Sequence, residues 1–117
     1  MKRDYSLFIK DILNSIDKIE SFIEGMDFEE FMKDEKTKSA VVREIEVIGE
    51  ATKRIPDSIR ERHKDLPWVD MARMRDKVIH FYFGVDYEIV WRVIKTRLPE
   101  IKPLIIGILE EYRHKDE

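Results

Sequence analysis

A short stretch of the chain combines three side chains that suit phosphodiester chemistry. Arg75, His80 and Tyr82 lie within eight residues, just before Gly84. An arginine keeps its charge, and its planar fork matches phosphate oxygens, while an imidazole titrates near neutral pH and can move protons. These residue types favour cleavage of a phosphodiester without a metal ion. Tyr82 adds a hydroxyl that can bind a ligand or be modified.

The spacing of the motif restricts how its residues can meet. On a regular helix, residues five apart point about 140° away from each other, so Arg75 and His80 do not share a face. Either the helix loosens before Gly84 and swings His80 round, or two copies of the helix meet in a composite site. In a twofold dimer, one His80 would take the proton from an RNA 2′-hydroxyl and the other would protonate the leaving 5′-oxygen. Arg75 would hold the phosphate.

Simpler interpretations compete with this one. A lone arginine and a lone histidine near a helix end are most often surface residues or caps. Six basic residues could form a nucleic-acid patch, but acidic residues are interleaved with them, which favours a solvated face; they are Arg60, Arg62, Lys64, Arg73, Arg75 and Lys77. Both tryptophans are predicted to be core residues. No two histidines have metal-ligand spacing, so we expect neither a metal nor a cofactor.

The elements that must position the motif are helices, because apolar residues recur at spacings of three and four along the chain. Asp27 and Glu30 form a predicted capping box, Gly25 is a predicted C-terminal cap, and Asp86 is a predicted N-cap. No strand pattern, repeat or linker is visible. The predicted helices span residues 4–24, 28–32, 39–54, 58–64, 67–83 and 87 onwards, with a polar turn at 34–38.

Three residues inside the predicted helices need a physical explanation. Gly49 costs about 1 kcal/mol relative to alanine, and close approach of another backbone is the expected compensation. Pro99 and Pro103 are expected to bend or restart the last helix. The helix that holds Gly49 also has apolar residues on two adjacent faces, which is more than one contact needs and would serve a dimer.

Composition predicts one all-α domain over residues 1–117, a four- to five-helix up-down bundle. The chain has no cysteine, which excludes thiolate chemistry and fits a cytoplasmic location. No apolar run is long enough for a transmembrane helix, so no membrane partner is expected. The net charge of −3 excludes attraction of nucleic acid by bulk charge, so RNA binding would need a local patch.

Several motifs occur in a characteristic order. They are Arg43-Glu44-Ile45-Glu46-Val47-Ile48-Gly49-Glu50-Ala51, then Leu66-Pro67-Trp68, then Met74-Arg75-Asp76 followed by Val78-Ile79-His80-Phe81-Tyr82. The pairs Val85-Asp86, Val90-Trp91 and Leu98-Pro99 follow. On these residues the chain resembles the HEPN superfamily, specifically the HepT-like toxins of prokaryotic toxin–antitoxin pairs.

The resemblance implies a helical-bundle homodimer with Arg75 and His80 in a cleft at the interface. It implies a metal-independent RNA endonuclease that acts as a toxin. It also implies a cognate antitoxin with a minimal nucleotidyltransferase fold, which transfers AMP from ATP to the motif tyrosine, here Tyr82. AMP adds bulk and negative charge, which would block the site and repel RNA.

The chain departs from the family pattern beside the motif arginine. Relatives often have asparagine at the next position, where this chain has Asp76, which adds a negative charge but can accept a hydrogen bond from Arg75 or His80. Glu50 is predicted to orient Arg75 from the neighbouring helix. The alternative function is a non-catalytic module that binds a nucleotide or RNA and acts through a nucleotidyltransferase partner; a third is a bundle that only scaffolds.

Overall fold

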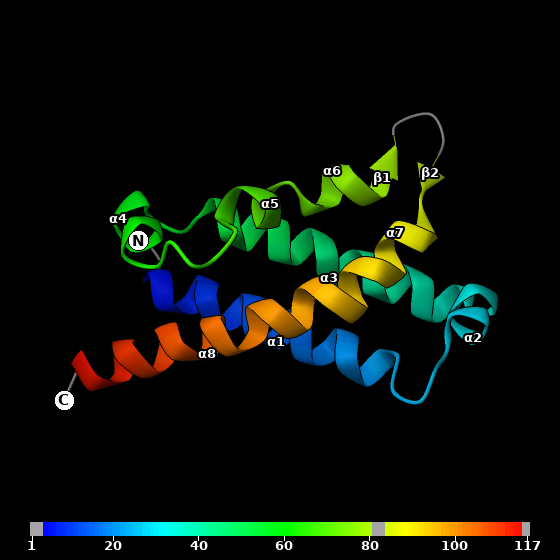
Figure 1. Cartoon of the computed structure of the whole chain (residues 1–117), viewed down its shortest axis with the longest axis horizontal. Helices are drawn as coiled ribbons and strands as arrows, with labels where there is room; N and C mark the ends of the chain where they lie inside the picture. Colours follow the sequence, from blue (N-terminus) through cyan, green and yellow to red (C-terminus); the bar gives the residue numbers. More distant parts are fainter. Residues whose placement is uncertain (1–3, 81–83, 116–117) are drawn as a thin grey trace.

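Three long helices frame the molecule. The computed structural model describes residues 4–80 and 84–115. Helix α1 (Tyr5–Phe22) packs against both α3 (Glu35–Lys53) and α8 (Leu98–Lys115) and runs antiparallel to them (Figure 1). Shorter helices connect the frame: α2 (Phe28–Lys33), α4 (Asp57–Arg62), α5 (Trp68–Ala72), α6 (Met74–Val78) and α7 (Tyr87–Arg92). The predicted all-α bundle is confirmed.

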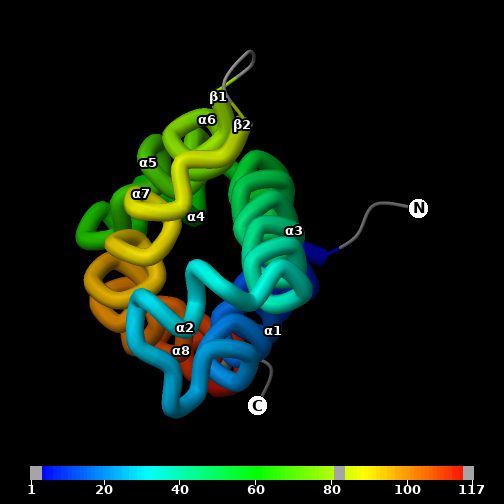
Figure 2. The backbone as a smooth tube through the Cα atoms, turned by 90° about the vertical axis from the view of Figure 1, so that its right-hand side faces the viewer, coloured from blue at the N-terminus to red at the C-terminus, as the bar shows by residue number. Residues whose placement is uncertain are grey.

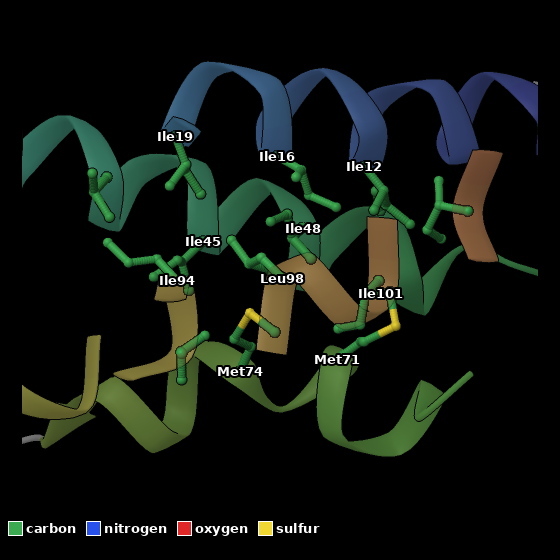
Figure 3. Packing of buried hydrophobic residues seen from close by; sticks show 14 of the residues in the cluster. Ile12, Ile16, Ile19, Ile45, Ile48, Met71, Met74, Ile94, Leu98 and Ile101 are labelled. Atoms are coloured by element: carbon green, nitrogen blue, oxygen red, sulfur yellow. The ribbon is translucent and has the colours of Figure 1, made fainter. Parts of the chain in front are cut away.

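One hydrophobic core lies between the long helices and α5 and α6. Isoleucines on one face of α1 meet the apolar face of α3, while α8 and two methionines close the core from the other side (Figure 3). Figure 2 shows the helices arranged around this interior. The central side chains are Ile12, Ile16, Ile19, Ile45, Ile48, Met71, Met74, Leu98 and Ile101. The predicted periodicity therefore identified the buried faces.

Aspartate side chains cap the starts of α1, α2, α3 and α7. The capping box of Asp27 and Glu30 is confirmed, with both reciprocal hydrogen bonds present. Asp86 caps α7 as predicted, since its carboxylate accepts the N–H of Ile89 at 3.2 Å. The backbone N–H of Ser6 donates to the carboxylate of Asp4 and lowers its pKa, because the bond stabilises the charged form.

The predicted polar turn at 34–38 is wrong. Asp34 accepts the N–H of Thr37 at 3.0 Å, which lowers the pKa of Asp34 and starts α3 at Glu35. The ammonium group of Lys38 is buried and donates to the Glu35 carboxylate at 2.9 Å. A cap and an ion pair between buried Lys38 and exposed Glu35 therefore extend the helix through residues that look like a turn.

The predicted continuous helix from Pro67 to Gly84 is also wrong. It is divided at Arg73 into α5 and α6, and the chain becomes extended at Ile79. A two-residue strand β1 (Ile79–His80) pairs antiparallel with β2 (Gly84–Val85). Strands this short leave no alternation to detect. Gly84 has φ +78°, a left-handed conformation that glycine adopts without strain.

The last helix absorbs both prolines without a break. Residues Val93–Arg97 form a π-helical turn, labelled η1, in which the N–H of Leu98 donates to the carbonyl of Val93. The wider turn precedes Pro99, whose ring would otherwise clash with the carbonyl four residues earlier. Pro103 lies inside α8. The expected restart of the helix is therefore wrong, and local widening replaces it.

Gly49 allows α3 and α5 to approach closely, as the sequence predicted. A methyl group at Gly49 would lie 3.4 Å from the carbonyl oxygen of Ala72. The contact brings α5, and α6 after it, down onto α3. Within the described residues, every helix is too short or too polar to cross a membrane.

Candidate active site

Arg75 lies in a groove formed by α1, α3 and α6. The groove has a volume of about 510 Å³. Phe8, Val47 and Ala51 contribute the apolar part of its lining, and the remaining lining residues are charged. They are Asp11, Arg43, Glu46, Glu50, Lys53, Arg54, Arg75 and Asp76. The groove is therefore a mixed surface in which charged side chains outnumber apolar ones.

The charges around the groove balance. Four side chains are cationic and four are anionic. Lys53 lies 3.4 Å from the carboxylate of Glu50, and both are exposed, so this pair contributes little stability.

The buried face of α6 fixes the position of Arg75. Met74 and Val78 are buried in the core, which turns Arg75 and Asp76 outward. Within the described residues, the guanidinium of Arg75 has no hydrogen bond or ion pair, so its donors are available to an incoming anion. Arginine presents them as a fork that can bind two phosphate oxygens at once.

His80 lines a different hollow. Its neighbours there are Met32 from α2, Val85 from β2, and the start of α7, and the hollow has a volume of about 460 Å³. Helix α6 does end before His80, as one of the two predicted arrangements requires. However, Arg75 and His80 then line separate hollows of the same chain. Loosening of the helix does not place them in one pocket.

The other predicted site residues have different outcomes. Asp76 and Glu50 both line the groove with Arg75. Glu50 forms its ion pair with Lys53, so its predicted support of Arg75 stays a prediction. Tyr82 lies outside the described residues, and its predicted modification also stays a prediction.

Several of the basic residues near the motif are engaged in structural contacts. Arg60 donates to the carbonyls of Ile55 and Thr52, and Lys77 lies 3.5 Å from the carboxylate of Asp70. Arg62 pairs with Glu111 of α8. In the described part of the chain, no three His, Asp or Glu side chains are grouped as a metal site.

Sequence reasoning missed two arginines of the groove. Arg43 and Arg54 stand on the same side of α3 as Val47 and Glu50. Their spacing of four, three and four residues is the signal that could have identified them, because such residues share a helix face. This face of α3 carries both charged and apolar residues, so a search for purely apolar helix faces does not identify it.

Comparison with known proteins agrees with the motifs. A family described as "Ribonuclease HepT-like" matches residues 12–108. The chain therefore belongs to the HepT-like family, which confirms the predicted resemblance. No solved structure matches it.

The relatives include archaeal proteins of nearly the same length. A protein of Methanocaldococcus jannaschii, named as a candidate RNase, is 48% identical over 116 residues, which cover 99% of this chain and 96% of the relative. A second candidate RNase from that organism is 47% identical, covering 97% and 98% of the two chains. "Probable ribonuclease HepT" of Thermococcus cleftensis is 46% identical, covering 87% and 93%.

Proposed function

We propose that this protein is a metal-independent RNA endonuclease whose active site is composed of two copies of the chain. The observation that carries the proposal is that Arg75 and His80 line two separate hollows of one chain. The chain belongs to a family described as "Ribonuclease HepT-like". A composite site gives both residues a role, because a twofold dimer would bring two Arg75 and two His80 into one cleft. The half-buried Phe8 and Val47 in the groove, together with its equal numbers of cationic and anionic side chains, support association of this kind.

The chemistry follows from the residue types. A neutral His80 imidazole takes the proton from the 2′-hydroxyl, and the 2′-oxygen attacks the phosphorus. The bond from phosphorus to the 5′-oxygen breaks, and a protonated His80 of the second copy gives its proton to that oxygen. Arg75 binds the phosphate and stabilises the charge that develops in the transition state. The products are a 2′,3′-cyclic phosphate and a 5′-hydroxyl.

Cleavage of labelled RNA in EDTA tests this proposal, after intact mass has established that the protein is unmodified. We expect wild-type protein to cleave and His80→Ala to lose at least a hundredfold in rate, since a general acid or base contributes roughly 10²–10⁴. His114→Ala, which removes another exposed histidine, is the matched control and should keep its activity. Equal cleavage by His80→Ala would contradict the assigned role.

We further propose that the protein acts as a toxin that a nucleotidyltransferase neutralises by transferring AMP to Tyr82. Tyr82 follows His80 by two residues in the sequence. An attached AMP would add bulk and a negative charge close to the reacting phosphate, and would therefore oppose RNA binding.

This regulation predicts a specific difference between two proteins. After incubation with the antitoxin and ATP, wild-type protein should gain the mass of AMP and stop cleaving RNA. Tyr82→Phe lacks the hydroxyl and should keep both its mass and its activity. Tyr87→Phe, which changes a second tyrosine five residues further along the chain, is the matched control and should still be modified. Modification of Tyr82→Phe would assign the acceptor to another residue.

A further inference from the structure

The hollow beside His80 differs in character from the groove that holds Arg75. It lies where α2, the β1–β2 hairpin and the start of α7 come together at one end of the molecule (Figure 1). Met32, Val85 and Tyr87 supply apolar surface, while Asp86 and Glu88 supply carboxylates. No lysine or arginine is among its described lining residues. The carboxylates disfavour a phosphate, so this hollow suits an uncharged part of an RNA chain.

Buried contacts hold the apolar wall of the hollow in place. The ammonium group of Lys38 lies 4.4 Å from the centroid of the Tyr87 ring, and the ring of Phe31 meets it edge-on at 6.2 Å. Lys38 is only 7% exposed, and it also donates to the carbonyl of Met32 at 3.1 Å. The Lys38 ammonium group therefore contacts both the Tyr87 ring and the backbone carbonyl of Met32. A fixed aromatic ring beside an apolar side chain is suited to stacking with a nucleobase.

The carboxylates give the hollow a preference among bases. Glu88 is exposed, and its carboxylate has no partner within the described residues. Asp86 uses one oxygen for the N–H of Ile89. Ionised carboxylates only accept hydrogen bonds, so they select bases that present N–H groups. Guanine offers two neighbouring donors, N1–H and N2–H, to the two oxygens of one carboxylate, whereas uracil offers a single N–H.

We infer that this hollow binds the base of the nucleotide next to the cleaved phosphate, that it prefers guanine, and that Glu88 determines the preference. The inference rests on the proposed nuclease function, because it places the base beside His80. With the base held against Met32 and Tyr87, the ribose lies towards His80 and the phosphate towards Arg75 of the second copy.

Two readouts on unmodified full-length protein test the inference. The first maps cleavage positions in RNA of random sequence, and the second titrates guanosine and uridine 3′-monophosphates by NMR. Wild-type protein should prefer guanine in both, and Glu88→Gln should lose roughly tenfold to hundredfold of that preference, the range for a bidentate base contact. Glu61→Gln, an exposed change on α4, is the matched control and should keep it.

Met32→Ala tests the stacking wall separately from the carboxylate. Met32 is 36% exposed, so its removal should not disturb the core. We expect weaker binding of both nucleotides, with the preference for guanosine retained. If Met32→Ala left binding of both nucleotides unchanged, it would argue against the assigned wall.

The outcomes separate this inference from the nuclease proposal. Cleavage without base preference, or a preference that Glu88→Gln leaves intact, would overturn the inference and leave the nuclease standing. Selective guanosine binding that Glu88→Gln abolishes, in a protein that cleaves no RNA, would support the base site and overturn the nuclease. Absence of both selective binding and cleavage would overturn the two together.

Discussion

At the scale of single residues, the side chains that carry the proposed chemistry are all exposed. Arg75, Asp76 and His80 stand on the surface, while their neighbours Met74 and Val78 are buried. The buried residues fix the backbone, and the exposed ones remain available to a ligand. Exclusion of water from these groups would have to come from RNA or from a second copy covering them, which would strengthen their electrostatic interactions.

Arg75→Lys tests whether the shape of the guanidinium matters in addition to its charge. Lysine keeps the charge but cannot bind two phosphate oxygens in a fixed plane. We expect RNA cleavage to fall by roughly tenfold to a thousandfold, the order seen when one transition-state donor is lost. Arg73→Lys is the control, because Arg73 is also exposed and does not line the groove. Full activity of Arg75→Lys would show that charge alone suffices.

At the scale of elements, one close contact positions the whole motif segment. Gly49 lets α5 lie against α3, and α6 follows α5 after a single residue. Arg75 therefore reaches the groove because α3, three elements earlier in the chain, has no bulky side chain at position 49. A larger residue there would push α5 and α6 outward.

Substitutions at Gly49 should separate helix propensity from packing. Gly49→Ala adds a methyl group at ordinary contact distance and improves helix propensity by about 1 kcal/mol, so stability should stay the same or rise. Gly49→Leu should lose about 1–3 kcal/mol through overpacking and should also weaken cleavage. Gly107→Leu is the control, since space around Gly107 is open. Urea unfolding measures both effects, and a stable, fully active Gly49→Leu would contradict the account.

At the scale of the whole molecule, the groove is the surface that suits a second copy. It lies along the outer side of the bundle, between α1, α3 and α6, and combines an apolar lining with balanced charges. The sequence predicts more apolar surface on α3 than one packing contact needs. Only part of that surface remains uncovered, because Ala51 is buried while Val47 is half-buried. Val47 is therefore the apolar residue of α3 that a partner would cover.

Val47→Glu should break the proposed dimer and abolish cleavage together, because a carboxylate would lose its hydration when a second copy covers it. Light scattering after size-exclusion chromatography gives the mass, and circular dichroism checks that the fold is kept. Val69→Glu is the control, because Val69 is 59% exposed and lies off the groove, so that variant should remain a dimer. Full activity in a proven monomer would refute the composite site.

The sequence by itself determined the helices and the buried faces. Apolar spacing, the Asp27 capping box and the Asp86 cap depend on residues within one or two turns of each other, so they can be recognised locally. Reliance on local patterns also explains two of the wrong predictions. The polar residues around the Asp34 cap are also typical of a turn, and the two-residue strand at Ile79 is too short to show an alternating pattern. The motif itself was recognisable as residue types in order.

Only the tertiary structure decided where the motif residues lie. The end of α6 at Val78, the pairing of His80 with Gly84 and the approach of α5 to Gly49 together place Arg75 in a groove and His80 in another hollow. These outcomes depend on contacts between segments that are separate in the chain, and local patterns carry no information about such contacts. The proposed composite site therefore rests on contacts that only the tertiary structure shows.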